Sequence, residues 1–397
     1  MASMQPAATA AIASLNSVQG PIKSPVSFSI IIETENLASA DLPGLFCSLD
    51  ALESQTLSPL SAAEVLMVET GDVPPELLDT IRAQYPWVTI CRIDAGLEYY
   101  QAKMRGIGLT TGEVVVLCDS DCVYNAEWLE SMLRPFSPDS ADNLASYDSV
   151  RDRSSSHDSA GNDSASDRTV IAPRPHAVQM VAGETSLAIT GPYGLAMALS
   201  YIFPRYTGCD RPQPTGGYFC NNVAFRRSLL TEFPIPGEMP LYRGNCVIHA
   251  KQLLANHQVI WQQPLARALH APPNGLSHFV SRFFMLGYDA LCVSRFANLP
   301  IAADPKAAVN AEQAAPLRPL RDFAVAGMIL VGQVKTLAQR LVQILREDIR
   351  YARYLPLALP ISLAALALYT VGLGVAYVRP AYWLNHRESL EALLEHS

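Results

Sequence analysis

The chain has 397 residues, enough to bury a large core in one big domain or two smaller ones. Hydrophobic residues make up 49% of the chain and charged residues 17%, a high apolar fraction for a purely soluble enzyme. The net charge of −8 argues against nucleic acid as a partner, and eight scattered cysteines without a Cys-x-x-Cys pair argue against a zinc site.

Two polar segments are predicted to be disordered. Residues 1–25 are rich in Ala, Ser and Pro and lack the basic and apolar regions of a signal peptide, so the sequence does not indicate secretion. Residues 137–169 are packed with Ser, Asp and Asn, and we expect a solvated insertion there.

Buried strands are predicted at residues 28–32 and 64–68, with a helix over residues 45–55 between them. Polar residues follow both apolar runs, with Thr34 after the first and Glu69 after the second. In open α/β sheets ligands bind at the carboxyl ends of the strands, so both side chains are expected near a ligand.

A further strand, residues 114–118, ends in Asp119 and Asp121, the most informative pair in the sequence. At the carboxyl end of a strand these carboxylates would face the ligand crevice. Hard carboxylate oxygens suit Mg²⁺ or Mn²⁺ carrying a diphosphate. The alternative is that Asp119 starts a turn and Asp121 caps a helix that begins near Ala126.

The order of motifs between residues 27 and 270 resembles that of the family 2 glycosyltransferases, enzymes with a Rossmann-like, A-type nucleotide-sugar-binding fold. Besides the strands above, the matching segments are Ala-Lys-Met-Arg-Gly-Ile (102–107), Thr-Gly-Glu (111–113), Gly-Gly-Tyr-Phe-Cys-Asn-Asn-Val-Ala-Phe-Arg-Arg (216–227) and Val-Ile-Trp (259–261) with a later histidine at 270. The resemblance predicts an α/β domain with a mixed central sheet over residues 26–300.

The resemblance also implies a donor site that depends on Mn²⁺ or Mg²⁺. In that site Asp119 would contact the ribose or the metal, Asp121 would ligate the metal, and His270 would supply a further metal ligand. Glu69 would replace the family's aspartate that accepts a hydrogen bond from the base. A purely structural histidine is the alternative for His270.

The other residues that the resemblance implicates lie around the nucleotide and the acceptor. Thr34 would line the nucleotide pocket, and Lys103 would neutralise phosphate or ribose-side charge, unless it is a solvated helix lysine. Gly217 and Asn222 would contact the acceptor, with a tight turn into a helix as the alternative. The family's Glu-Asp pair, which supplies the catalytic base, is absent, and His249 is the nearest group that could serve chemically.

Residues 355–378 carry no charge and are long enough, at about 1.5 Å per residue, to cross a bilayer core of about 30 Å. Four arginines between residues 340 and 353 precede this stretch, so the positive-inside bias predicts a single-pass protein with its catalytic domain in the cytoplasm, at the cell inner membrane. We expect the remaining apolar segments to lie on the membrane or the protein rather than to span: residues 187–203, 323–334 and 337–349, with 301–354 as linker and surface helices and 379–397 as a tail.

These features predict an inverting, membrane-anchored glycosyltransferase of polysaccharide biosynthesis. It would move a sugar from a nucleotide-sugar donor to a lipid-linked or polysaccharide acceptor, without a nucleic-acid partner. One alternative is a nucleotidyltransferase of similar fold, although the acidic turn at residues 33–36 lacks a Gly-rich, basic phosphate loop. Another is a catalytically impaired scaffold that binds nucleotide sugars or glycans.

Overall fold

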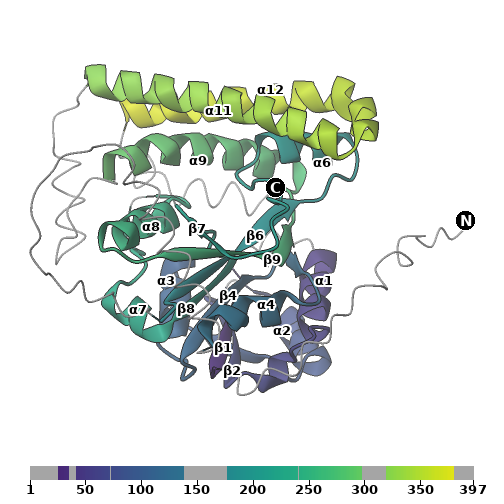
Figure 1. Cartoon of the computed structure of the whole chain (residues 1–397), viewed down its shortest axis with the longest axis vertical. Coiled ribbons are helices and arrows are strands. Elements are labelled where there is room, and N and C mark those ends of the chain that lie inside the picture. The colour runs from purple at the N-terminus through teal and green to yellow at the C-terminus, as the bar shows by residue number, and fades with distance from the viewer. Residues whose placement is uncertain are drawn as a thin grey trace, which may run out of the picture.

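The computed structural model describes residues 26–34, 42–71, 73–137, 177–239, 241–296 and 319–379 (Figure 1). The predicted disordered N-terminus at 1–25, nearly all of the predicted insertion at 137–169, residues 297–318 and the predicted tail beyond residue 379 lie outside the described residues.

A nine-stranded sheet forms the centre of the described chain, in the order β3-β2-β1-β4-β8-β6-β9-β5, with β7 paired to β9. Its strands are β1 (Phe28–Glu33), β2 (Glu64–Glu69), β3 (Thr89–Arg92), β4 (Val114–Asp119), β5 (Cys122–Tyr124), β6 (Met180–Leu187), β7 (Gln213–Thr215), β8 (Asn222–Arg226) and β9 (Ile260–His270). The strands β3, β2, β1 and β4 are parallel, whereas β8 is antiparallel to β4. The predicted α/β fold with a mixed sheet is therefore confirmed.

Helices cover both faces of the parallel half, which is why β1 and β4 are buried along their whole length. One face packs against α1 (Leu42–Glu53), α2 (Pro75–Gln84) and α4 (Trp128–Leu133). The other face packs against α3 (Tyr99–Ile107), α7 (Arg227–Glu232) and α8 (Asn245–Ala255). Short 3-10 turns lie at η2 (Pro59–Ser61) and η3 (Arg134–Phe136).

A separate layer of helices lies over the far half of the sheet (Figure 1). It consists of α6 (Pro192–Ser200), α9 (Gly275–Phe296), α11 (Pro319–Glu347), the 3-10 helix η4 (Ile349–Tyr354) and α12 (Leu355–Val378). A Cβ atom on Gly287 of α9 would lie 1.9 Å from the Tyr369 carbonyl oxygen, and one on Gly372 of α12 would lie 1.9 Å from that of Phe284. Glycine at both positions lets the two helix backbones touch, so α12 is packed as part of the folded unit.

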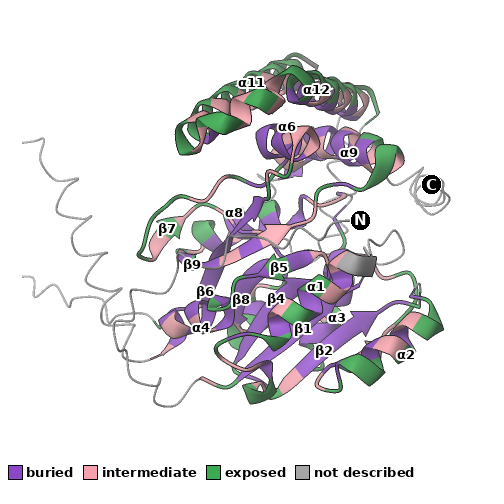
Figure 2. Cartoon of the chain, turned by 90° about the vertical axis from the view of Figure 1, so that its right-hand side faces the viewer, coloured by how far each residue is buried: buried purple, intermediate pink, exposed green. Residues whose placement is uncertain are grey.

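The helix α12 has two different faces (Figure 2). Its buried face is made mostly of small residues: Ala358, Ser362, Ala365, Gly372 and Ala376. Its exposed residues are larger and apolar: Leu357, Leu363, Val371 and Val378. Among the described residues, one helical stretch, Ile349–Val378, is long and apolar enough to cross a membrane, and it includes the predicted span.

Some sequence-based expectations differ in detail from the structure. Strand β5 lies between Asp121 and α4, which has Glu127 at its N-cap, so the alternative that Asp121 caps this helix is wrong. Within residues 187–203 the helix is α6 alone, because Gly191 has a positive φ and Pro192 begins the helix. The apolar run at 323–334 and the amphipathic segment after it are parts of one helix, α11.

Candidate functional site

Parallel pairing brings the polar ends of three strands to one edge of the sheet. The register places Glu33 of β1 beside Asp119 of β4, and β2 ends next to them at Glu69. All three side chains are buried, and so is Thr34, whose hydroxyl donates to the Val68 carbonyl over 3.0 Å. The predicted nucleotide-side residues therefore share one edge, as the strand order requires.

A buried cation compensates the carboxylate at the centre of this edge. The Lys103 ammonium is fully buried and lies 2.6 Å from Asp119 Oδ1. The Tyr99 hydroxyl, from the first turn of the same helix, lies 2.9 and 2.8 Å from the two Asp119 oxygens. Burial by itself would lower the pKa of Lys103, but the Asp119 charge raises it above its usual value. Lys103 is thus an internal counter-charge rather than a solvated helix lysine.

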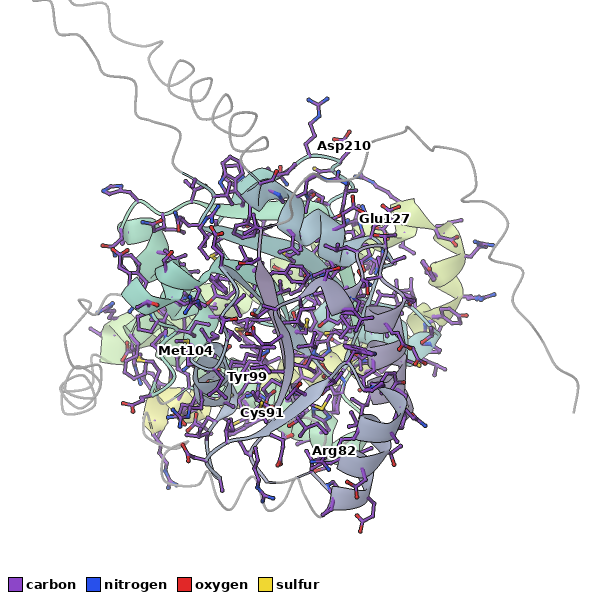
Figure 3. The ribbon with its side chains drawn as sticks, turned by 90° about the horizontal axis from the view of Figure 1, so that it is seen from below. Arg82, Cys91, Tyr99, Met104, Glu127 and Asp210 are labelled. Atoms are coloured by element: carbon purple, nitrogen blue, oxygen red, sulfur yellow. The ribbon has the colours of Figure 1, made fainter. Side chains whose placement is uncertain are left out.

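The start of α3 is fixed by a capping box, in which Gln101 reaches back to the Glu98 backbone N–H over 3.0 Å. This cap sets the direction in which Tyr99 projects toward Asp119. Seen from below, Tyr99 lies in the middle of the fold, whereas Asp210 lies at the rim (Figure 3). Sequence reasoning missed Tyr99, because a tyrosine at a helix start carries no motif of its own.

At Asp121, a carboxylate oxygen and a histidine ring nitrogen face each other. Antiparallel pairing of β5 with β9 aligns Cys122 with His270, and the Ala271 N–H donates to the Asp121 carbonyl over 2.9 Å. This brings His270 Nε2 to 3.4 Å from Asp121 Oδ2. His270 Nδ1 lies 2.5 Å from the Ala271 carbonyl oxygen and donates to it, which leaves Nε2 to face the Asp121 carboxylate.

Asp121, Cys122 and His270 form the described cluster with metal-ligand geometry, their ligand atoms lying within 4.8 Å of one another. Burial and the nearby carboxylates raise the pKa of the Cys122 thiol well above its usual value, and a soft sulfur is a poor match for Mn²⁺ or Mg²⁺. The structure thus brings together two of the three predicted metal ligands. Asp119 lies apart from this cluster and is held by Lys103 and Tyr99.

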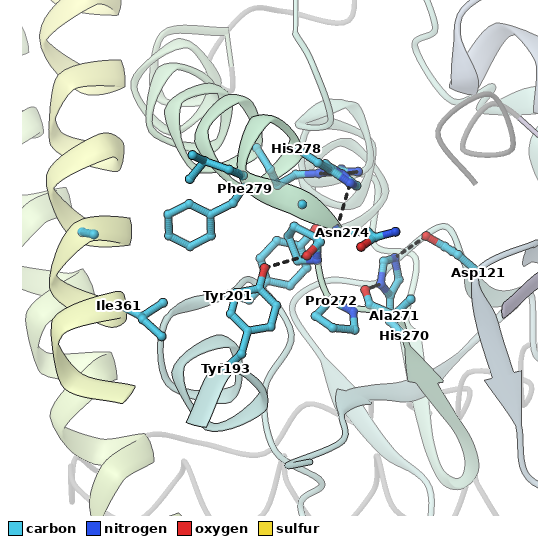
Figure 4. Close-up of a pocket in the computed structure, with 15 residues that line it drawn as sticks. Asp121, Tyr193, Tyr201, His270, Ala271, Pro272, Asn274, His278, Phe279 and Ile361 are labelled. Atoms are coloured by element: carbon cyan, nitrogen blue, oxygen red, sulfur yellow. Dashed lines mark hydrogen bonds and ion pairs between the residues drawn. The ribbon is translucent and has the colours of Figure 1, made fainter. Parts of the chain in front are cut away.

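A cavity of about 740 Å³ opens from this pair toward the helical layer (Figure 4). Its lining includes Asp121 and His270 at one end and Ile361 and Ala364 of α12 at the other, so residues far apart in sequence form one space. The predicted membrane helix is therefore a wall of the candidate site. No sequence motif indicated this role.

The side of the cavity formed by α9 carries a buried cation. Arg282 is 6% exposed and lines the cavity, and its Nη2 lies 3.1 Å from His278 Nε2. Its guanidinium also lies over the Tyr242 ring, 5.1 Å from the centroid. Burial and the charge of Arg282 lower the pKa of His278 to about 3, so the imidazole does not add a second charge at neutral pH.

The other predicted site residues do not line this cavity. Asn222 is fully buried, with its Oδ1 accepting from Trp128 Nε1 over 2.7 Å and its Nδ2 donating to the Glu184 and Ala266 carbonyls over 3.1 Å. Contact with an acceptor would require these bonds to break. Gly217 lies before β8 with open space where a Cβ would be.

His249 is fully buried inside the packed region around α8. Its Nε2 donates to the Phe233 carbonyl over 2.9 Å, and its Nδ1 lies 2.6 Å from the Tyr218 hydroxyl, so both nitrogens are used. Burial lowers the pKa of His249 to about 4. A role as catalytic base stays a prediction that this arrangement does not favour.

A carboxylate from another helix, Asp289 of α9, lies at the segment that leads into α8. Asp289 accepts hydrogen bonds from the backbone N–H groups of Tyr242 and Arg243 over 2.8 and 2.6 Å. Burial raises the pKa of Asp289 to about 6 despite these bonds. Asp289 does not line the cavity, and it anchors the start of α8 to α9.

The comparison with protein families agrees with this architecture. The model of the family described as glycosyl transferase family 2 matches residues 29–230. No curated protein sequence matches this chain.

Two solved structures are similar to the chain at low sequence identity. One, of GalNAc-T7 with UDP, GalNAc and Mn²⁺, has 12% identity and a TM-score of 0.46, over 73% of this chain and 55% of that chain. The present chain thus spans about half the length of that structure. The other, mannosyltransferase PcManGT from Pyrobaculum calidifontis in complex with GDP-Man and Mn²⁺, has 16% identity and a TM-score of 0.47, over 92% of this chain and 90% of that chain.

Proposed function

Since the chain belongs to glycosyl transferase family 2, we propose that this glycosyltransferase moves a sugar, with inversion, from a nucleotide-sugar donor to a lipid-linked or polysaccharide acceptor at a membrane. The observation that carries this proposal is the Asp121–His270 pair at the mouth of the 740 Å³ cavity. On one side of this pair lie the polar strand ends, and on the other lies the apolar wall of α12. A donor and an acceptor would meet between them.

The residues at this point suit a divalent cation. A carboxylate oxygen and an imidazole nitrogen, both with lone pairs, face each other at 3.4 Å, and a cation between them would satisfy both. Mn²⁺ accepts this mixed oxygen and nitrogen set readily, and Mg²⁺ prefers oxygen. Such a cation, when bound, offsets the charge of the leaving diphosphate.

The protein's own groups would position the donor. Thr34 and Glu69 stand at the strand ends where the base and ribose would bind, and Glu69 Oε2 accepts from the Gly71 N–H over 2.7 Å, which holds its carboxylate in place. Lys103 compensates the charge of the Asp119 carboxylate and holds it in place. The proposed mechanism assigns no proton transfer to His249, because both of its nitrogens are bonded inside the core.

We propose that the membrane is contacted by the exposed apolar residues of α11 and α12, which cover the outer side of the helical layer. The length and composition of Ile349–Val378 support this. Cytoplasmic orientation follows from the basic residues that precede α12 and belongs to the same proposal.

Incubation of the full-length protein in detergent with a panel of UDP and GDP sugars tests the function. We expect release of the nucleoside diphosphate from at least one donor, dependent on Mn²⁺ or Mg²⁺ and lost in His270→Ala. Asp79→Asn is a matched control, because the Asp79 side chain on α2 is 75% exposed and does not line the cavity.

The sequence left two alternatives, a nucleotidyltransferase and a non-catalytic scaffold. Membership of the glycosyltransferase family contradicts the nucleotidyltransferase interpretation. A non-catalytic scaffold would bind a nucleotide sugar without ever releasing its diphosphate, and that result would overturn the proposed activity.

A further inference from the structure

The helix α12 lies along the domain rather than projecting from it. In Figures 1 and 2 it runs beside α11, above α9 and the sheet. Hydrogen bonds hold it near both ends. Ser362 Oγ donates to the Ala196 carbonyl of α6 over 3.3 Å, and Arg295 Nη1 of α9 donates to the Ala376 carbonyl over 3.1 Å. Since buried residues also recur from its first turn to its last, folded protein accompanies α12 over its whole length.

If α12 crossed a bilayer, the helices packed beside it would have to enter the hydrocarbon with it. The helix α9 carries buried Arg282 and Asp289, and its Arg295 pairs with Asp322 of α11 over 2.9 Å. Ionisable side chains are costly at that depth. Among the described residues, only Ile349–Val378 is long and apolar enough to cross a membrane. The packing therefore requires three spanning helices where the composition supplies one.

The position of the cavity leads to the same conclusion. Ile361 and Ala364, the α12 residues that line it, lie about 9–14 Å along the helix from its start, at about 1.5 Å per residue. In a spanning helix that distance would be a depth in the bilayer, and Asp121 and His270 line the same cavity. A cation and a nucleotide sugar are charged and would be excluded from such a depth. The site stays accessible to them if α12 lies parallel to the membrane surface.

The outer side of the helical layer has the composition of a membrane-surface element. Exposed apolar residues follow both helices: Phe323, Met328, Val331 and Val334 on α11, and Leu357, Leu363, Val371 and Val378 on α12. Between residues 335 and 354, five basic side chains stand against two carboxylates: Lys335, Arg340, Arg346, Arg350 and Arg353 against Glu347 and Asp348. Apolar side chains suit the boundary of the acyl chains, and the excess positive charge suits anionic headgroups.

We propose that α11, η4 and α12 lie in the plane of one leaflet of an anionic phospholipid bilayer, so that the protein rests on the membrane without crossing it. The exposed apolar residues of both helices enter the acyl boundary, and the basic segment 335–354 contacts lipid phosphates. Both ends of the chain are then on the same side of the membrane. This rests on the membrane contact in the proposed function, and it replaces the single crossing predicted from the composition of residues 355–378.

Protease protection tests the topology of the full-length chain with one epitope tag at each end. The chain is expressed in a bacterial host, and sealed inverted vesicles of the inner membrane are treated with protease before and after addition of detergent. We expect both tags to be removed without detergent, because both ends face the outside of these vesicles. Removal of the N-terminal tag alone, with the C-terminal tag protected until detergent is added, would show a single crossing and overturn the proposal.

Tryptophan variants along α12 report its depth by quenching with brominated phospholipids, measured as the difference from the wild type. Lipids brominated near the headgroup should quench Leu357→Trp, Leu363→Trp and Val371→Trp to within about two-fold of one another, because an interfacial helix lies about 5–10 Å deep throughout. Leu60→Trp, at an exposed position in η2, is the control and should not be quenched. Deeply brominated lipids that quench Leu363→Trp and Val371→Trp strongly but spare Leu357→Trp would indicate a crossing helix and contradict the proposal.

Charge variants test the anionic headgroups. Arg346→Gln should weaken binding to vesicles of phosphatidylcholine and phosphatidylglycerol about five-fold, the worth of roughly one arginine at an anionic surface, and should leave binding to pure phosphatidylcholine unchanged. Arg82→Gln on α2 is the matched control, at a side chain 54% exposed outside the helical layer, and should change neither. Equal effects of the two substitutions would overturn the role of the basic segment.

Flotation of the wild type with the same vesicles separates this proposal from the one on which it rests. A wild type that floats but protects its C-terminal tag keeps the membrane contact and loses the in-plane arrangement. A wild type that does not float, and that forms dimers with rising concentration in sedimentation, would assign the apolar face to a second copy of the chain. That result would overturn both the in-plane arrangement and the membrane contact, while the sugar-transfer assay would still test the activity.

Discussion

The two sides of the candidate site are built on different principles. On the nucleotide side, polar residues follow parallel strands, and the central carboxylate, Asp119, is already matched by Lys103 and Tyr99. On the cavity side, Arg282 comes from α9 and Ile361 from α12, and the buried Arg282 guanidinium lies against His278 and Tyr242. The first side is assembled by strand ends and one adjacent helix, whereas the second is assembled by the packing of helices that are far apart in the sequence.

The largest effect on stability is expected from removal of Lys103, the buried counter-charge of Asp119. Lys103→Met leaves the buried Asp119 carboxylate uncompensated and should lower the free energy of unfolding by about 3–5 kcal/mol, measured by thermal denaturation. Because such a variant can fail to accumulate, the double variant Lys103→Met with Asp119→Asn is the control and should recover much of the loss. Full stability of the single variant would mean that the nucleotide side is not internally balanced.

The lowered pKa of His249 should change the free energy of unfolding by about 3 kcal/mol with pH. Its pKa is about 4 in the folded protein and 6.5 when unperturbed, so the unfolded chain takes up a proton first as the pH falls. The stability that this group contributes is therefore present above pH 6.5 and is lost as the pH falls through about 4. His249→Gln, which can bond Tyr218 and Phe233 without titrating, should show a shallower decline of melting temperature between pH 6.5 and 4.

The same variant separates structure from catalysis. If His249→Gln binds nucleotide normally and still transfers sugar, the histidine is a core residue. Loss of transfer with intact folding and nucleotide binding would restore the base role predicted from the sequence.

A smaller effect on stability is expected at the contact between α9 and α12, where two glycine substitutions form a matched pair. Gly372→Ala puts a Cβ against the Phe284 carbonyl and should cost about 1–3 kcal/mol, while Gly374→Ala, two residues away with open space, should be neutral or slightly stabilising. Melting temperatures of the detergent-solubilised protein provide the measurement. Equal behaviour of the two variants would show that α12 does not dock on the catalytic domain, and the cavity side would lose its wall.

The smallest change in stability is expected on the outer face of α12. Leu363→Ser should alter the free energy of unfolding by less than about 0.5 kcal/mol, because the side chain is 62% exposed, but it should reduce flotation with phospholipid vesicles. Leu60→Ser, at 74% exposure in η2 between α1 and β2, is the control and should float as the wild type does. Identical flotation of both variants would show that the outer face of α12 does not contact the membrane.

The sequence predicted the sheet well because its strands are continuous apolar runs that end in polar residues. The strands around Asp119 and the helix after the first strand appear within a few residues of their expected bounds. Asp121 and His270 were expected together from the resemblance, and the pairing of β5 with β9 explains physically why they meet.

The cavity could not be predicted, since it depends on which face of α12 packs against α9. The apolar stretch at 355–378 has the composition of a membrane span on every side, and only the small-residue positions, such as Gly372, mark the docked face. Lys103 was ambiguous because a helical lysine is ordinarily solvated; its burial follows from the carboxylate beside it. Arg282 had no motif, and its place in the cavity wall follows only from the packing of α9.

The central claim is that Asp121 and His270 hold the cation on which donor binding depends. Calorimetric titration of UDP and GDP sugars into the full-length protein, with and without Mn²⁺, tests it directly when wild type and Asp121→Asn are compared. We predict that Mn²⁺ strengthens binding of the preferred donor to the wild type and has little effect on Asp121→Asn, because an amide lacks the charged oxygen ligand. An unchanged Mn²⁺-dependent affinity in the variant would contradict the account.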